Sequence, residues 1–129
     1  MKKLTSILLL LLLSAGFAGA QTTDGNINAA MKLGNHKELS KHFDTKVDLT
    51  ILAKENSYSK AQAELIIKQF FAKGKVINYQ VIHHGRSRDG ARYAIGKLTT
   101  ANRTYRTYVL TKEVNGHVRI QQLRFEDND

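Results

Sequence analysis

Residues 59–74 have the sequence SKAQAELIIKQFFAKG, which predicts one well-determined helix. The opening Ser59-Lys60-Ala61-Gln62 is a capping box, in which the serine and the glutamine bond each other's backbone N–H groups. Lys73 and Gly74 are typical of a helix end, and we expect Gly74 to be left-handed. The apolar stripe at helical spacing consists of Ala63, Ile66, Ile67, Phe70 and Phe71.

The chain after Gly74 predicts a meander of four antiparallel strands. Residues 76–84, 91–100, 104–113 and 117–126 are rich in Tyr, Thr, Val and Ile, which favour strands. Asn115-Gly116 is typical of a tight hairpin, because both central residues of a type I′ turn need positive φ. The apolar positions change parity at Gln121-Gln122, which predicts a bulge, and Gly96 predicts a bend in the second of these strands. We therefore expect a strongly curved sheet.

Before residue 59 the sequence predicts two short helices and one strand. The first helix spans residues 24–33 and stops at Gly34, and Asn35 caps a second helix that buries Leu39 and Phe43. Apolar and polar residues alternate over 47–51, which is the period of a strand with one buried face.

The first 20 residues predict a cleavable signal peptide. Lys2 and Lys3 precede an apolar run over 7–13, and Ala18-Gly19-Ala20 follows as the cleavage site. The apolar stretch is about ten residues long, shorter than the roughly 20 that a permanent transmembrane helix needs, although an uncleaved anchor is the alternative. We expect one α+β domain over residues 21–129, periplasmic or secreted and not integral to a membrane after cleavage.

The charge and the cysteine count narrow the class of partner. Loss of Lys2 and Lys3 lowers the net charge from +9 to +7, and the chain has no Cys to form a disulfide. A basic surface favours anionic partners, while nucleic acid is the wrong partner for an exported protein. The alternative is that the positive charge only keeps the protein soluble.

The order of elements resembles the cystatin-like cone of the nuclear-transport-factor-two superfamily, which includes ketosteroid isomerases and polyketide cyclases. A closer resemblance, to a bacterial family of exported domains of unknown function, is carried by the segments VDLTI (47–51), YSKAQAE (58–64), HGRS (84–87), YAIG (93–96) and YRTY (105–108). The resemblance implies N-terminal helices packed on a curved antiparallel sheet and an address in the cell envelope. It brings no catalytic residues.

Four side chains are candidates for lining a cavity inside such a cone. His83 shares strand parity with the apolar Ile77, Tyr79 and Val81, so we expect His83, rather than His84, to point inward. Arg106 and Tyr108 share parity on a central strand, and all four together would suit a small anionic or amphipathic ligand. The competing interpretation is that the tyrosines form cross-strand packing pairs and that Arg106 lies on the convex face.

The loop after residue 84 is a candidate for binding anions. Arg86, Ser87, Arg88 and the nearby Arg92 concentrate forked hydrogen-bond donors that suit phosphate or carboxylate. The alternative is an ordinary solvated hairpin loop.

The sequence predicts no catalytic residue, metal site or cofactor. Asp48 is turned away from the apolar face of its strand, and the adjacent His83 and His84 point to opposite faces, so they cannot share one ion. The leading hypothesis is a non-enzymatic module that binds a small ligand or a protein. A lyase or isomerase is the alternative, with His83 as base and Tyr79 or Arg106 stabilising negative charge. A homodimer through the convex sheet face is a third hypothesis.

Overall fold

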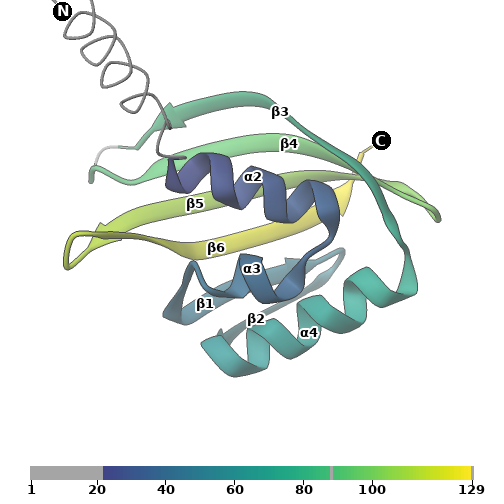
Figure 1. Ribbon diagram of the computed structural model, residues 1–129, viewed down its shortest axis with the longest axis horizontal. Coiled ribbons are helices and arrows are strands. Elements are labelled where there is room, and N and C mark those ends of the chain that lie inside the picture. Colours follow the sequence, from purple (N-terminus) through teal and green to yellow (C-terminus); the bar gives the residue numbers. More distant parts are fainter. Residues whose placement is uncertain (1–21, 88, 129) are drawn as a thin grey trace, which may run out of the picture.

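Three helices lie on one face of a six-stranded sheet in the computed structural model, which describes residues 22–87 and 89–128 (Figure 1). The strand order is β2-β1-β6-β5-β4-β3. The helices are α2 (Thr23–Leu33), α3 (His36–Ser40) and α4 (Lys60–Lys73). The strands are β1 (Phe43–Ile51), β2 (Lys54–Ser59), β3 (Val76–Arg86), β4 (Arg92–Thr100), β5 (Thr104–Val114) and β6 (His117–Asp127). The predicted signal peptide and its cleavage site lie outside the described residues.

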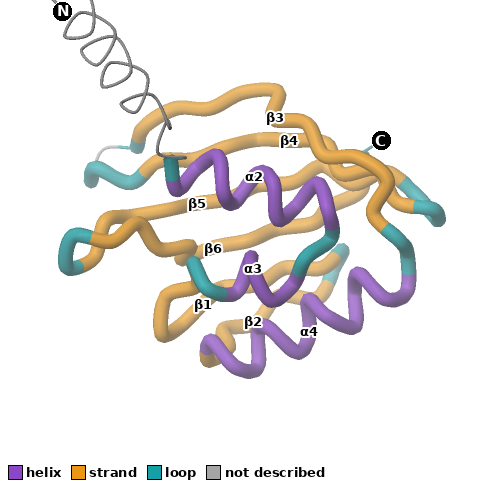
Figure 2. Tube along the Cα trace, viewed as in Figure 1, coloured by secondary structure: helices purple, strands orange, loops and turns teal. Residues whose placement is uncertain are grey.

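The predicted meander is confirmed, since β3, β4, β5 and β6 pair antiparallel in sequence order. The β1–β2 hairpin joins the sheet at the other side of β6, where β1 runs parallel to β6. Figure 2 shows α2 crossing the strands of the meander, while α3 and α4 cover the β1–β2 side. In the part of the chain that the structure describes, no helix is long and apolar enough to cross a membrane.

The predicted helix caps are present. Ser59 and Gln62 form both bonds of the capping box, each at 3.3 Å. The Asn35 side chain accepts from the Glu38 N–H at 3.2 Å, and Gly34 ends α2 with a φ of 62°. These local bonds fix where each helix begins, and the helix faces then follow from the apolar stripes.

The core lies between the helices and the inner face of the sheet. Ala63, Ile67 and Phe71 of α4 are buried as their spacing predicts. An aromatic cluster closes the α4 side, with the ring centroid of Phe70 4.6 Å from that of Phe125 and 5.1 Å from that of Tyr105. These rings pack between α4 and strands β5 and β6.

Three local predictions differ from the structure. Residues 54–59 form the edge strand β2, which the sequence does not reveal because nearly all its residues are exposed and no apolar alternation exists. Phe43 is buried, but it begins β1 rather than belonging to the second helix. Gly74 is extended, with a φ of −146°, because the chain passes directly from α4 into β3.

Three bulges curve the meander. Leu110 pairs with Gln122 and Thr111 with Ile120, so Gln121 is the extra residue, as predicted. The other two bulges are in β3. Ile77 is the extra residue between Val76 and Asn78, and Ile82 is the extra residue where Val81 pairs with Gly96 and His83 with Ile95. The irregularity predicted at Gly96 of β4 thus lies on the neighbouring strand β3, directly after Val81, the residue that pairs with Gly96.

Candidate functional site

A cleft on the α2 side, called here the α2 cleft, lies between the first half of α2 and strands β3, β4 and β5. Its volume is about 540 Å³. Its apolar lining comes from Ile27, Val81, Ala94 and Val109, and its polar lining includes Asp24, Asn28, His84, Arg86 and Arg92. The cleft is a part of the cone that the core side chains leave open.

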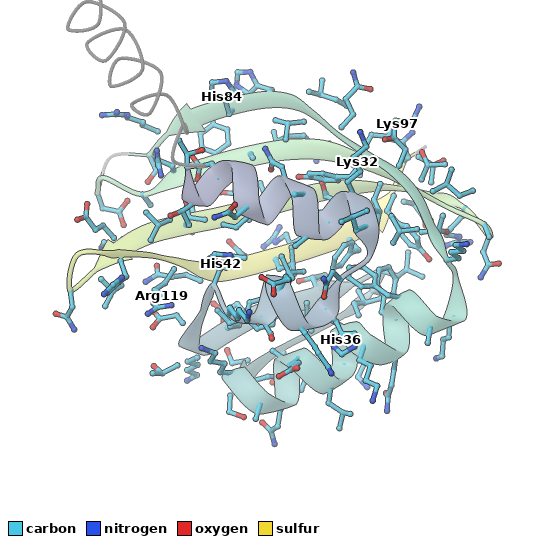
Figure 3. All side chains as sticks on the ribbon, in the orientation of Figure 1. Lys32, His36, His42, His84, Lys97 and Arg119 are labelled. Atoms are coloured by element: carbon cyan, nitrogen blue, oxygen red, sulfur yellow. The ribbon has the colours of Figure 1, made fainter. Side chains whose placement is uncertain are left out.

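The bulge at Ile82 decides which histidine reaches this cleft. His84, which is labelled on β3 in Figure 3, is a lining residue of the cleft, whereas the His83 Nε2 lies 3.3 Å from the Tyr93 hydroxyl. His83 pairs with Ile95, on the outer face of the sheet, which is the face opposite the helices. The prediction that His83 points inward is wrong, because the extra residue inverts the alternation after Val81.

Arg92 and Asp24 form a forked ion pair at the edge of the α2 cleft. Arg92 Nη1 lies 3.2 Å from Asp24 Oδ2, and Nη2 donates to Oδ1 at 3.3 Å. This pair joins the start of α2 to the start of β4 at the edge of the cleft. Asp24 and Asn28 were not predicted as site residues, although their spacing of four places them on one face of α2.

The predicted anion-binding loop is divided by the structure. Arg86 lines the α2 cleft, and no ion-pair partner for it exists among the described residues. Ser87 instead donates its hydroxyl to Asp89 Oδ1 at 2.5 Å. This bond, helped by the Ala91 N–H, holds the pKa of Asp89 below its usual value. Arg88 lies outside the described residues.

The four predicted cavity residues do not share one cavity. Tyr79 is buried in the core, and Arg106 and Tyr108 lie on the outer face, because Tyr105, Thr107 and Val109 occupy the inner positions of β5. The Tyr108 ring stacks on that of Tyr93, with centroids 6.1 Å apart and planes 13° from parallel. The competing interpretation therefore describes Tyr108, which packs across the strands on Tyr93, and Arg106, which lies on the outer face.

The remaining acidic and histidine residues form no evident metal site. Over residues 22–87 and 89–128, no group of three or more His, Cys, Asp or Glu side chains could hold an ion. Asp48 is exposed, and it accepts a hydrogen bond from the Ser57 hydroxyl on β2. In the α2 cleft, the arginines offer hydrogen-bond donors, and the one lining carboxylate, that of Asp24, is already paired with Arg92. This lining suits recognition of an anion.

Residues 25–126 match the family model described as "Domain of unknown function (DUF4783)". The chain belongs to this family. A DUF4783 protein from Bacteroides uniformis, solved as a crystal structure, is 34% identical, with 84% of this chain and 99% of that chain covered and a TM-score of 0.79. The resemblance to a bacterial family of unknown function is thus confirmed. No curated protein matches the chain.

More distant structures show the fold alone. An NTF2-like protein of unknown function from Cytophaga hutchinsonii is 13% identical, covering 84% of this chain and 92% of that chain, with a TM-score of 0.58. A domain of unknown function with a cystatin-like fold from Nostoc punctiforme is 10% identical, covering 81% of this chain and 72% of that chain, with a TM-score of 0.64. The predicted cystatin-like, NTF2-like α+β fold is confirmed.

Proposed function

We propose that this DUF4783 protein is a non-enzymatic module that binds a small anionic ligand in the α2 cleft, in the periplasm or outside the cell. The observation that carries the proposal is that His84, Arg86 and Arg92 meet at one cleft with an apolar floor. The proposed location rests on the signal-like sequence of residues 1–20.

The chemistry of the cleft favours an anion with an apolar body. Arg86 presents a planar fork of donors that matches carboxylate or phosphate oxygens. Arg92 already holds Asp24, so its role is to keep α2 in place and to offer its remaining N–H groups. The apolar floor of Ile27, Val81 and Val109 would contact the body of the ligand.

The enzyme alternative has no geometric support. His83 and Arg106 lie on the outer face and Tyr79 lies in the core, so none of the three residues lines the α2 cleft. Asp24, the carboxylate that lines the α2 cleft, is held in the pair with Arg92. A base and an oxyanion donor must converge on one reacting atom in a pocket, and these three residues do not supply such a pair in the α2 cleft.

The test is to measure binding of phenyl phosphate and benzoate to the protein by isothermal titration calorimetry. We expect Arg86→Gln to weaken phenyl phosphate binding about tenfold, because a charged hydrogen bond is worth roughly 1.5–3 kcal/mol. Arg106→Gln is the matched control, since it removes the same charge from the outer face. Native mass spectrometry of protein purified from its own host would report any retained anion.

Two outcomes would count against the proposal. One is equal weakening by Arg86→Gln and Arg106→Gln, which would indicate a general effect of net charge. The other is equal affinity for phenyl phosphate and benzylammonium, a cation with a similar apolar body.

A second candidate function is self-association through the outer face. Helices cover the inner face, yet the outer face carries half-buried apolar and aromatic side chains, namely Tyr93, Ile95, Tyr108 and Leu110. A solvated sheet face is usually polar, so an uncovered apolar band favours a partner surface. A homodimer would place two such bands against each other.

A further inference from the structure

A second cleft lies at the opposite end of the sheet, and its chemistry differs from that of the α2 cleft. It is bounded by the tip of the β1–β2 hairpin, the second half of α4 and the turn between β4 and β5, and its volume is about 520 Å³. Its walls include the apolar and aromatic side chains of Ile51, Leu52, Tyr58, Ile66, Phe70 and Tyr105. This hairpin cleft thus has a surface suited to an apolar chain.

Cations surround this apolar surface. Lys54, Lys73 and Arg103 line the hairpin cleft, and no Asp or Glu does among the described residues. Arg103 Nη1 is bonded to Asp127 Oδ1 at 2.9 Å, but Lys54 and Lys73 form no ion pair with a described residue. The carbonyl oxygen that ends α4, on Lys73, accepts from Asn102 Nδ2 at 2.7 Å and is therefore satisfied. The lining attracts a negatively charged group.

The backbone conformation of Leu52 is a second, independent observation that points to an apolar ligand in the hairpin cleft. Its φ is 55°, a left-handed conformation that strongly disfavours a large apolar residue. The other non-glycine residue with positive φ among those described is Asn115, which is common at such turns. Leu52 is nevertheless 38% exposed at the cleft. Neither turn geometry nor core packing explains a leucine here, whereas contact with an apolar ligand does.

We propose that the hairpin cleft binds a free amphipathic carboxylate, meaning an unbranched acyl chain with one terminal carboxylate. The chain lies against Leu52, Tyr58 and Phe70, and the carboxylate lies between Lys54 and Lys73. The site shares no lining residue with the α2 cleft, so it does not depend on the function proposed there. Each added methylene buried in the cleft raises the affinity about fourfold.

The probe is decanoate, which is titrated into the protein purified from its own host. We expect saturable binding that is at least tenfold tighter than binding of decyltrimethylammonium, a cation with the same chain. Lys54→Gln with Lys73→Gln weakens decanoate binding at least tenfold. The matched control is Lys32→Gln with Lys97→Gln, an equal loss of charge at residues outside the cleft (Figure 3).

Leu52→Asn tests the apolar wall separately. Asparagine tolerates the left-handed turn, so this variant folds, and we expect decanoate to bind it at least fivefold more weakly. The proposal is overturned if decanoate does not saturate, if the two head groups bind equally, or if Leu52→Asn binds as tightly as the wild type. Binding to anionic phospholipid vesicles without saturable binding of decanoate would also overturn it, and would assign the surface to a membrane instead.

Discussion

Tyr79 is a buried phenol packed against the backbone of β4. Its ring lies so close to Gly96 that a Cβ there would be 2.9 Å from the ring. The hydroxyls of Tyr79 and Thr107 are both buried without a partner at hydrogen-bonding geometry. Burial raises the pKa of Tyr79, and the nearby Thr107 hydroxyl offsets only part of the rise. The folded protein therefore holds this phenol in its neutral form.

This pKa shift predicts a loss of stability at alkaline pH. A group with a raised pKa in the folded state stabilises the fold below its ordinary pKa, near 10 for tyrosine, and this stabilisation is lost as the pH rises through the folded value. We expect Tyr79→Phe to be as stable as the wild type at pH 7, or about 1 kcal/mol more stable, because it removes an unpaired hydroxyl. Its advantage should increase between pH 9 and 11.

Urea unfolding across that pH range measures the free energy of unfolding of both proteins. Tyr108→Phe on the outer face serves as the control. A difference between Tyr79→Phe and wild type that stays constant with pH would contradict the interpretation of Tyr79 as a buried neutral phenol.

At the residue scale, the sequence could identify residues of the site, but not the face of the sheet on which each side chain lies. Arg86 and Arg92 were predicted from clustered donors, and both line the α2 cleft. His83 was chosen over His84 by counting strand parity, and a single bulged residue, Ile82, reverses that choice. An exposed isoleucine leaves no apolar alternation that could locate the bulge.

At the scale of elements, α4 ends where the sequence predicts, but the physical reason differs from the predicted one. Gly74 ends the helix as predicted, but its extended backbone is open to any residue. What excludes a side chain is Asn102, since a Cβ at Gly74 would lie 3.0 Å from Asn102 Nδ2. Asn102 in turn donates to the Lys73 carbonyl oxygen and so caps the helix from the β4–β5 turn.

A double-mutant cycle tests this cause. We expect Gly74→Ala to lower the free energy of unfolding by about 1 kcal/mol, because it displaces the Asn102 side chain from the helix end. In an Asn102→Ala background the same change should cost less than half as much. Chemical denaturation of the four proteins gives the coupling. Equal costs in both backgrounds would indicate a backbone requirement at Gly74 instead.

The elements that the sequence predicts best are those whose signals are local. The capping box of Ser59 and Gln62 and the Asn115-Gly116 turn depend on neighbours within a few residues, and both are present. Strand β2 depends on pairing with β1, from Lys46 with Ser59 to Ile51 with Lys54, and has no apolar face of its own. The parallel pairing of β1 with β6 joins distant parts of the chain and leaves no mark in either segment.

At the scale of the whole molecule, the sheet has one face covered and one uncovered. The three described helices all lie on the inner face (Figure 1). On the outer face, Tyr93 and Tyr108 stack, and the Arg124 guanidinium carbon lies 5.9 Å from the centre of the Tyr108 ring. These contacts order the apolar band before any partner binds, which lowers the entropic cost of association.

We therefore predict that the protein forms a homodimer through the outer face. A stable dimer typically buries about 800 Å² on each partner. Tyr108 lies on β5, between β4 and β6, and so inside the sheet rather than at its edge. Tyr108→Glu should give a monomer in analytical ultracentrifugation, because each partner would then bury a carboxylate and the neighbouring Arg124 guanidinium in place of an apolar ring, and desolvating the two charges costs more than their pairing returns. Leu33→Glu is the matched control: it also replaces an apolar residue by an acid, but on exposed α2, and should remain dimeric. A wild-type protein that stays monomeric at high concentration would exclude the dimer and leave the apolar band for a different partner.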